Sequence, residues 1–389
     1  MRYLQIFFLI TIIQLNSFAQ NIEVGAAQLN QYLPLLQNKN IGLVVNQTST
    51  IGQTHLLDTL LKLNIKVKKV FAPEHGFRGV ADAGEHVKNG IDPSTNTPII
   101  SLYGNNKKPK AEQIKDLDIL IFDIQDIGVR FYTYISTLQY VMEACAENKK
   151  KLIILDRPNP NGHYVDGPIL DTQYRSFVGM QQIPIVHGMT VGEYAKMLNG
   201  EKWLSNKLQC NITIIPCRNY DHKTFYQLPI KPSPNLPNMQ SIYLYPSLCL
   251  FEGTDHVSLG RGTTLPFQIY GSPSFPKTLN YQFTPQSLPG AKTPPQLNQQ
   301  CFGYNLSEIS LTELQKNKFT LKYFINAYQL TNNKTTFFNT FFVKLYGKGN
   351  LSTQLKNKMT EAEIRKTWQQ GLQKFKTIRK KYLLYKDFE

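Results

Sequence analysis

The sequence is poor in cysteine and lacks the short motifs of several large enzyme classes. Its five cysteines leave at least one thiol without a partner in the same chain, and there is no CxxC pair. An extended segment between Cys210 and Cys217 would hold their Cα atoms about 23 Å apart, too far for a disulfide. HExxH, GxSxG, Walker A and GxGxxG are absent. The usual signatures of zinc peptidases, α/β-hydrolases, P-loop enzymes and dinucleotide-binding enzymes are therefore missing.

Long apolar segments are also absent. Residues 4–15 form a short apolar run after Arg2, and the small residues Ser17 and Ala19 follow it, a pattern typical of a signal peptide. A membrane-spanning helix needs about 20 apolar residues, and no cysteine follows the run to carry a lipid anchor. We expect residues 1–19 to be a signal peptide, and the mature protein to be periplasmic or secreted without stable membrane insertion.

Acidic residues are in the minority, and the net charge is +16. The basic residues are spread along the chain and are densest at residues 374–381, where a solvated helix face is the simplest interpretation. No nucleic-acid-binding motif accompanies the charge, so we predict no nucleic-acid partner. Attraction to an anionic cell wall or an acidic sugar polymer is a second interpretation.

Four short apolar runs each end in a dense polar cluster. The runs cover residues 41–45, 65–71, 117–122 and 152–155. Continuous apolar runs are typical of buried parallel strands, and open α/β sheets bind ligands at the carboxyl ends of such strands. The polar residues that follow therefore indicate one shared site for a hydroxyl-rich ligand. They are Asn46, Gln47, Glu74, His75, Asp123, Gln125, Asp126, Arg130, Tyr132, Tyr134, Asp156, Arg157 and Asn159.

Helical patterns alternate with these strands in the first part of the chain. They cover residues 26–37, 54–63, 111–117 and 137–149, and Thr54 is the expected cap of the second helix. Strands and helices that alternate at this spacing predict an α/β fold with a Rossmann-like parallel sheet.

The pattern changes after about residue 165. Thr190 and Glu193 have the spacing of a capping box, residues 272–295 have the composition of a loop, and residues 311–330 and 361–381 are predicted to be helical. We predict a Rossmann-like N-terminal domain at residues 21–165, a smaller α+β C-terminal domain at residues 166–389, and an active-site cleft between them.

Carboxylates in the polar clusters favour glycoside hydrolysis, which uses an acid together with a nucleophile, a base or an orienting carboxylate. Glu74 is the candidate acid, with His75 as an orienting or proton-carrying neighbour, although Glu74 could instead pair with Arg78. Asp123 and Asp126 are further catalytic candidates, and Asp126 could equally cap a helix. Three residues of the second half are candidates for binding substrate: His187, Glu252 and Arg261.

A metal site is a weaker alternative. Glu74, His75, Asp82, Glu85 and His86 offer oxygen and nitrogen ligands. Their spacing matches no standard zinc motif. We therefore predict no metal and no cofactor.

Ten motifs in fixed order resemble the exo-β-N-acetylmuramidase (NamZ-like) family. They are VVNQTS, FAPEHGFRG, DAGE, SLYG, FDIQDIGVRFYTYISTL, LDRPNP, HGMTVGEYA, PSPNLP, FEGT and GRGTTLPF. The resemblance extends from about residue 41 to residue 385. It implies a Rossmann-like domain, a smaller C-terminal domain and a cleft between them. It also implies release of terminal N-acetylmuramic acid from the non-reducing end of peptidoglycan fragments, with Glu74 as the acid, and the other candidate residues fall within matching motifs.

The chemistry of such a substrate is consistent with the candidate residues. The lactyl carboxylate of N-acetylmuramic acid suits an arginine fork, for which Arg130 and Arg157 are candidates. The 2-acetamido group could act as an internal nucleophile, or a second carboxylate could attack directly or activate water. The expected partner is a peptidoglycan-derived glycan such as MurNAc-GlcNAc. Two other functions are a non-catalytic muropeptide-binding protein and a metal-dependent amidase or deacetylase acting on the same polymer.

Overall fold

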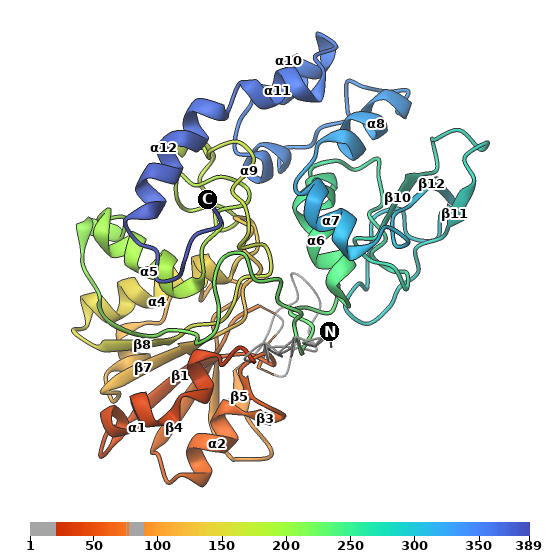
Figure 1. The fold of residues 1–389 in the computed structure, drawn as a ribbon. Helices are drawn as coiled ribbons and strands as arrows, with labels where there is room; N and C mark the ends of the chain where they lie inside the picture. Colours follow the sequence, from red (N-terminus) through yellow and green to blue (C-terminus); the bar gives the residue numbers. More distant parts are fainter. Residues whose placement is uncertain (1–20, 75, 78–88) are drawn as a thin grey trace, which may run out of the picture.

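The computed structural model describes residues 21–74, 76–77 and 89–389. Residues 1–19, where we expect a signal peptide, lie outside this range. Figure 1 shows a large sheet with helices on both faces, and a second group of helices and short strands beside it. No helix among the described residues is long and apolar enough to cross a membrane.

The large sheet has seven strands in the order β5-β6-β4-β1-β7-β8-β9. Six of them are parallel, and β5 runs antiparallel at one edge. Numbered along the chain, the parallel strands have the order 3-2-1-4-5-6 of the doubly wound dinucleotide-binding fold. This confirms the predicted α/β class. The strands are β1 (Ile41–Val45), β4 (Val67–Ala72), β5 (Gly90–Ile91), β6 (Pro98–Ser101), β7 (Ile119–Asp123), β8 (Lys151–Leu155) and β9 (Asn211–Ile215).

The central strands are apolar throughout because both faces of the sheet are covered. In β7, Leu120 and Phe122 belong to one hydrophobic cluster, whereas Ile121 belongs to another on the opposite face. Side chains alternate along a strand, so a strand buried on both faces needs apolar residues at every position. Helices α1 (Leu29–Leu36) and α2 (Leu56–Lys62) lie on one side of the sheet, and α4 (Tyr134–Glu147) and α5 (Val191–Gly200) lie on the other (Figure 1).

The helix starts follow local capping chemistry. Thr190 and Glu193 form the predicted capping box at the start of α5. The predicted cap of α2 is wrong: Thr54 lies in a short hairpin of β2 (Thr50–Ile51) and β3 (Thr54–His55). The His55 ring caps α2 by accepting a hydrogen bond from the Leu57 amide. The short helix α3 covers Ala111–Ile114.

The parallel sheet extends beyond residue 165, where the sequence analysis ends the first domain, because β9 at residues 211–215 is its last strand. The remainder is a three-stranded antiparallel sheet, β10-β12-β11, surrounded by helices. Its strands are β10 (Ile269–Ser272), β11 (Tyr281–Phe283) and β12 (Cys301–Asn305), so the segment 272–295, predicted to be a loop, contains one short strand.

Most helices of the second half are short. The two long helices predicted there are each divided: residues 311–330 form α7 and α8, and residues 361–381 form α11 and α12. The full set is α6 (Met239–Leu248), the 3-10 helix η4 (Cys249–Gly253), α7 (Leu311–Asn317), α8 (Lys322–Leu330), α9 (Phe342–Tyr346), α10 (Leu351–Lys356), α11 (Glu361–Lys366) and α12 (Gln369–Lys380). Short 3-10 helices also occur at η1 (Gly25–Ala27), η2 (Thr172–Tyr174) and η3 (Ser205–Lys207).

The end of the chain returns to the first domain. The Tyr385 hydroxyl donates to Asp156 Oδ2 at 2.6 Å, and the Leu384 amide donates to Glu193 Oε1 at 2.9 Å. Asp156 directly follows β8 and Glu193 lies in α5. The C-terminal residues thus complete the hydrogen bonding of the sheet domain. All five cysteines are buried and free.

Candidate active site

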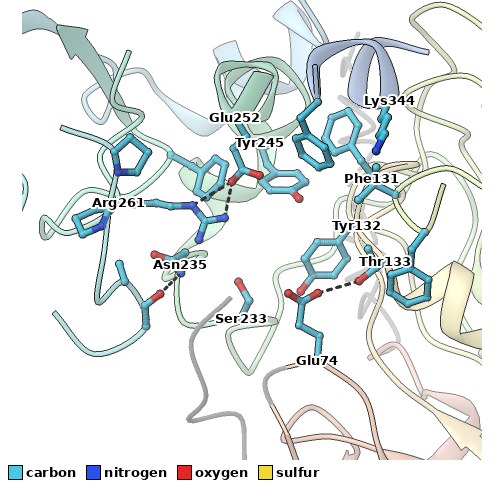
Figure 2. Close-up of a pocket in the computed structure, with 18 of the residues that line it drawn as sticks. Glu74, Phe131, Tyr132, Thr133, Ser233, Asn235, Tyr245, Glu252, Arg261 and Lys344 are labelled. Carbon is cyan, nitrogen blue, oxygen red and sulfur yellow. Dashed lines mark hydrogen bonds and ion pairs between the residues drawn. The ribbon is translucent and has the colours of Figure 1, made fainter. Parts of the chain in front are cut away.

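A cavity of about 840 Å³ lies between the two halves of the chain. Its volume falls within the range of small-molecule sites, roughly 300–1,000 Å³. The sheet domain contributes Glu74, which follows β4, and residues 131–134, which precede or begin α4. The opposite wall comes from residues 233–295 and from α9 (Figure 2). The cavity therefore has the position expected for a ligand site at the carboxyl end of parallel strands.

Glu74 presents its carboxylate to this cavity (Figure 2). Oε1 accepts a hydrogen bond from the Tyr103 hydroxyl at 3.0 Å, and Oε2 accepts one from the Thr133 hydroxyl at 3.1 Å. Tyr103 follows the neighbouring strand β6, and Thr133 is the N-cap residue of α4. Both donors are hydroxyl groups, and together they fix the orientation of the carboxyl group.

Aromatic side chains form much of the cavity wall. Tyr132 and Tyr245 meet edge to face, with ring centroids 5.7 Å apart, and Phe131 lies 5.6 Å from Tyr245. Tyr134 also lines the cavity and contacts Tyr132 edge to face at 5.0 Å. Rigid aromatic walls with a few polar groups are typical of sites that bind a ligand in one orientation.

Glu252 and Arg261 form an ion pair on the wall opposite Glu74 (Figure 2). Arg261 Nε donates to Glu252 Oε1 at 3.0 Å, and Nη2 donates to the same oxygen. Burial opposes the charged form of Arg261, but the Glu252 carboxylate raises the pKa of the guanidinium above its ordinary value. Gly260 and Gly262, on either side of Arg261, have φ values of 84° and 76°, a conformation that favours glycine.

A proline-rich loop at residues 231–237 completes the cavity. Gln47 Nε2 donates to the Lys231 and Pro232 carbonyls, and the Tyr132 hydroxyl donates to the Pro232 carbonyl at 2.9 Å. These bonds anchor the loop to the sheet domain. Ser233 and Asn235 of the loop line the cavity. Gln47 itself does not line it.

The cavity also contains basic side chains. Lys107 Nζ lies 4.8 Å from the centre of the Phe177 ring, and Lys292 makes an interaction of its own. Lys344 projects from α9 toward the cavity (Figure 2). Its side chain has no ion-pair partner among residues 21–74, 76–77 and 89–389.

Asp123 and Arg157 are buried away from the cavity. Arg157 Nε donates to Asp123 Oδ1 at 2.5 Å, and Nη2 donates to Oδ2 at 3.0 Å. Neither residue lines the cavity. In this structure, therefore, Asp123 does not reach a ligand in the cavity as a catalytic group would, and Arg157 is committed to Asp123 rather than to a substrate carboxylate.

Asp126 and His187 also lie in the interior. Asp126 Oδ2 accepts a hydrogen bond from the Gly128 amide at 2.6 Å and lies 3.9 Å from His187 Nε2. Burial raises the pKa of Asp126 to about 7, although backbone donors at Gly128 and Ile127 oppose this rise. Burial also lowers the pKa of His187 to about 3, so the imidazole is neutral near neutral pH. Neither residue lines the cavity.

The other predicted binding residues support the backbone beside the site. Asn46 Oδ1 accepts from the Thr48 amide, and Gln125 Nε2 donates to the Pro158 carbonyl. Arg130 donates to the carbonyls of Pro168, Ile183 and Leu345, which ties the sheet domain to α9. Asp156 accepts from the Thr190 hydroxyl and the Gly192 amide, and Asn159 donates to the Met189 carbonyl. None of them lines the cavity.

His75, Asp82, Glu85 and His86 lie outside the described residues. Within the described part of the chain, no group of three or more His, Cys, Asp or Glu side chains could hold a metal ion.

The structure therefore brings five of the sequence candidates to the cavity and adds others. Glu74, Tyr132, Tyr134, Glu252 and Arg261 line it. The sequence analysis missed Tyr103, Thr133, Ser233, Asn235 and Tyr245. Tyr103 follows a strand and could have been found by the rule that selected the other candidates. Tyr245 lies within the largely buried helix α6, and nothing in the sequence around it distinguishes it from a core residue.

Comparisons with known proteins agree with this arrangement. Residues 41–240 match the family model described as "Exo-beta-N-acetylmuramidase NamZ, N-terminal", and residues 243–385 match the C-terminal model of the same description. A Bacillus subtilis (strain 168) protein named peptidoglycan beta-N-acetylmuramidase NamZ is 39% identical over 376 residues, which span 92% of this chain and 89% of that protein.

Two solved structures share the fold. Both are DUF1343 family proteins from Bacteroides fragilis NCTC 9343. One is 52% identical with a TM-score of 0.88, and the other is 28% identical with a TM-score of 0.81. Each comparison covers 94% of this chain and 99% of the other. The chain belongs to the exo-β-N-acetylmuramidase NamZ family.

Proposed function

We propose that this protein is an exo-acting β-N-acetylmuramidase that releases terminal N-acetylmuramic acid from the non-reducing end of peptidoglycan fragments. The observation that carries the proposal is the Glu74 carboxylate, held by two neutral hydroxyl donors at an aromatic-walled cavity. Membership of the family, and the name of the relative from Bacillus subtilis, support a glycosidase acting on peptidoglycan.

Glu74 is suited to act as a general acid. Its two hydroxyl neighbours can adapt to either protonation state of the carboxyl group, since a hydroxyl can donate or accept. A protonated Glu74 can transfer its proton to the glycosidic oxygen as the bond to C1 of the sugar breaks. The aromatic wall of Tyr132, Tyr134 and Tyr245 supports binding of a sugar ring beside this carboxyl group.

The proposal includes export. The sequence of residues 1–19 has a basic start, a short apolar run and a small-residue cleavage pattern, which supports delivery to the periplasm or the medium where peptidoglycan fragments occur.

The test compares wild type and Glu74→Gln on MurNAc-GlcNAc, on a 4-nitrophenyl β-N-acetylmuramide and on the matching β-N-acetylglucosaminide. We expect wild type to cleave both muramides and to leave the glucosaminide intact. Loss of the acid costs most when the leaving group is poor. Glu74→Gln should therefore lose about 10²–10⁴-fold in rate on the disaccharide, and much less on the 4-nitrophenyl glycoside.

Two further measurements define the activity. A longer glycan labelled at its reducing end should release single muramic acid residues and keep the label on the large product if cleavage is exo-acting. Full activity in the presence of a chelator is expected. Loss of turnover with chelator would favour the metal-dependent alternative, and sugar binding without turnover would favour the binding-protein alternative.

A further inference from the structure

One end of the cavity is enclosed by buried aromatic side chains. Four of them line it with between 1% and 8% of their surface exposed: Phe131, Tyr132, Tyr245 and Phe267. Figure 2 shows Tyr132 beside the Glu74 carboxylate. An enzyme that removes the last sugar of a chain holds that sugar where the site is closed, and the rest of the chain leaves through the opening. The buried aromatic end is therefore suited to the terminal sugar.

A second group of lining residues is only partly buried: Lys107, Phe177 and Val178. Phe177 and Val178 form the tip of a tight hairpin, in which the backbones of Ser176 and Gly179 exchange two hydrogen bonds of 3.0 Å. Because the side chains of this group both line the cavity and reach solvent, they mark its opening.

The opening lies close to the candidate acid, which is held by the Tyr103 and Thr133 hydroxyls. Lys107 follows Tyr103 by four residues in the loop after β6. The Phe177 ring stacks on Tyr140, with centroids 6.0 Å apart, and Tyr140 lies about two turns beyond Thr133 in α4. A glycosidic oxygen at the acid has one sugar on each side of it. With the terminal sugar at the enclosed end, the next sugar lies toward Lys107 and Phe177.

Lys107 and Phe177 have the chemistry to hold that sugar. Lys107 Nζ lies 4.8 Å from the centre of the Phe177 ring, and it has no carboxylate at ion-pair distance in the part of the chain that the structure describes. An ammonium group has three hydrogen-bond donors, and a contact with an aromatic face orients it without an acidic partner. Phe177 adds an apolar surface that stacking on Tyr140 keeps in place.

The hairpin itself is supported by the core. A Cβ at Gly179 would lie 3.2 Å from Leu170 Cδ2 and 3.5 Å from Arg130 Cδ, so the hairpin packs closely against both residues. Arg130 in turn donates to the Leu345 carbonyl of α9 at 2.7 Å. The tip is therefore fixed relative to both walls of the cavity, as expected of a preorganised binding surface.

We infer that Phe177 and Lys107 form the binding site for the second sugar of the substrate, the N-acetylglucosamine that leaves when the glycosidic bond breaks. The inference rests on the proposed function. The apolar face of this sugar packs against Phe177, and the Lys107 ammonium donates hydrogen bonds to its hydroxyl or acetamido oxygens. These two residues thus contribute to the choice of leaving group, and the enclosed aromatic end holds the terminal sugar.

The test measures binding in the Glu74→Gln background, where the disaccharide should be cleaved only slowly. Phe177→Ala and Lys107→Met are introduced separately, and calorimetry gives the Kd of MurNAc-GlcNAc and of N-acetylmuramic acid alone. We expect each substitution to weaken binding of the disaccharide about 5- to 10-fold, and to change binding of the monosaccharide less than about 2-fold. With Glu74 present, each should raise KM for MurNAc-GlcNAc by a similar factor and leave the inhibition constant of N-acetylmuramic acid unchanged.

Phe225→Ala and Lys108→Met are the matched controls. Phe225 is 54% exposed, Lys108 pairs with Glu147 at 2.6 Å, and both lie outside the cavity. Neither control should change the Kd of either sugar. Melting temperatures establish that every variant is folded.

The outcomes separate the inference from the proposed function. Wild type that cleaves no muramide would overturn the proposed function, and with it the assignment of a leaving sugar. If wild type cleaves MurNAc-GlcNAc, equal losses of binding for the two sugars would overturn only the inference, because Phe177 and Lys107 would then shape the site as a whole. Unchanged binding of the disaccharide in both variants would also overturn it.

Discussion

Asp123 and Arg157 form a two-point ion pair beneath the carboxyl ends of the sheet, with distances of 2.5 Å and 3.0 Å between the paired atoms. The Arg157 guanidinium also donates to the Thr50 carbonyl at 3.0 Å, so the pair joins β7, the segment after β8 and the β2–β3 hairpin. Both side chains are almost fully buried. This pair therefore stabilises the carboxyl end of the sheet, beside which Glu74 lies.

Removal of one partner of this pair should destabilise the fold more than it changes the chemistry. Asp123→Asn leaves a buried guanidinium without its counter-charge, and we expect the free energy of unfolding to fall by about 3–5 kcal/mol. Urea denaturation gives this value, and kcat per folded molecule should change little. The double variant Asp123→Leu/Arg157→Met should lose less stability than Asp123→Asn. A stable Asp123→Asn protein with no activity would instead give Asp123 a catalytic role.

The stability contribution of Asp126 should depend on pH. Burial raises its pKa to about 7 from the ordinary value of 3.8, so the folded state binds this proton more tightly than the unfolded state does. The contribution is fully present below pH 3.8 and is lost as the pH rises through about 7. Asp126→Asn cannot titrate and keeps an acceptor for the Gly128 amide.

The melting temperature of Asp126→Asn, relative to wild type, should therefore increase between about pH 5 and pH 8. Scanning fluorimetry across this range measures the difference. A difference that stays constant with pH would show that Asp126 does not titrate in this way.

Gln47 should affect substrate binding indirectly, by holding the proline-rich loop at residues 231–237 in position. Its amide holds the Lys231 and Pro232 carbonyls, and the loop supplies Ser233 and Asn235 to the cavity. Gln47→Met keeps the length of the side chain but loses both hydrogen bonds, each contributing about 1 kcal/mol. We expect KM on MurNAc-GlcNAc to rise roughly 10-fold, with kcat retained. Gln369→Met, on α12, is the control. A large fall in kcat with unchanged KM would exclude this positioning role.

Lys344 should contribute to recognition of the lactyl carboxylate. Arg261 is committed to Glu252 and Lys107 lies over Phe177, whereas Lys344 points to the cavity without an acidic partner in the described part of the chain. A charge-assisted hydrogen bond contributes about 1.5 kcal/mol or more. Lys344→Gln should weaken binding of N-acetylmuramic acid about 10-fold and leave the weaker binding of N-acetylglucosamine unchanged, as measured by calorimetry.

Lys348→Gln provides the comparison for Lys344, because Lys348 pairs with Asp171 at 3.0 Å outside the cavity. Equal losses for both sugars in Lys344→Gln would assign Lys344 a general role in the shape of the site rather than recognition of the carboxylate.

The sheet could be predicted from the sequence because each of its central strands is a continuous apolar run. Val44 and Leu43 belong to cores on opposite faces, which is the arrangement that such a run indicates. The extent of the sheet was less predictable: β9 adds a strand after a long connection from β8. Because β9 lies at the edge of the sheet, most of its residues are only partly buried. Its sequence therefore lacks the continuous apolar run that marks the central strands.

The site was only partly predictable for a related reason. Polar residues after strands gather at one edge of the sheet, but the sequence does not tell which of them face the ligand and which face each other. Glu74, just beyond β4, faces the cavity, whereas Asp123, the last residue of β7, faces Arg157. The opposite wall depends on tertiary packing of the second half, and Tyr245 reaches the cavity from a helix whose sequence has no polar cluster.

The return of the chain end to the sheet domain has a consequence for the order of events in folding. Tyr385 and Leu384 bind Asp156 and Glu193, which are more than 190 residues earlier in the sequence. The sheet domain therefore acquires these hydrogen bonds only once residues 384 and 385 have been synthesised. Until then the first domain of the nascent chain lacks these contacts, and a domain that completes its folding late is compatible with the export proposed for this protein.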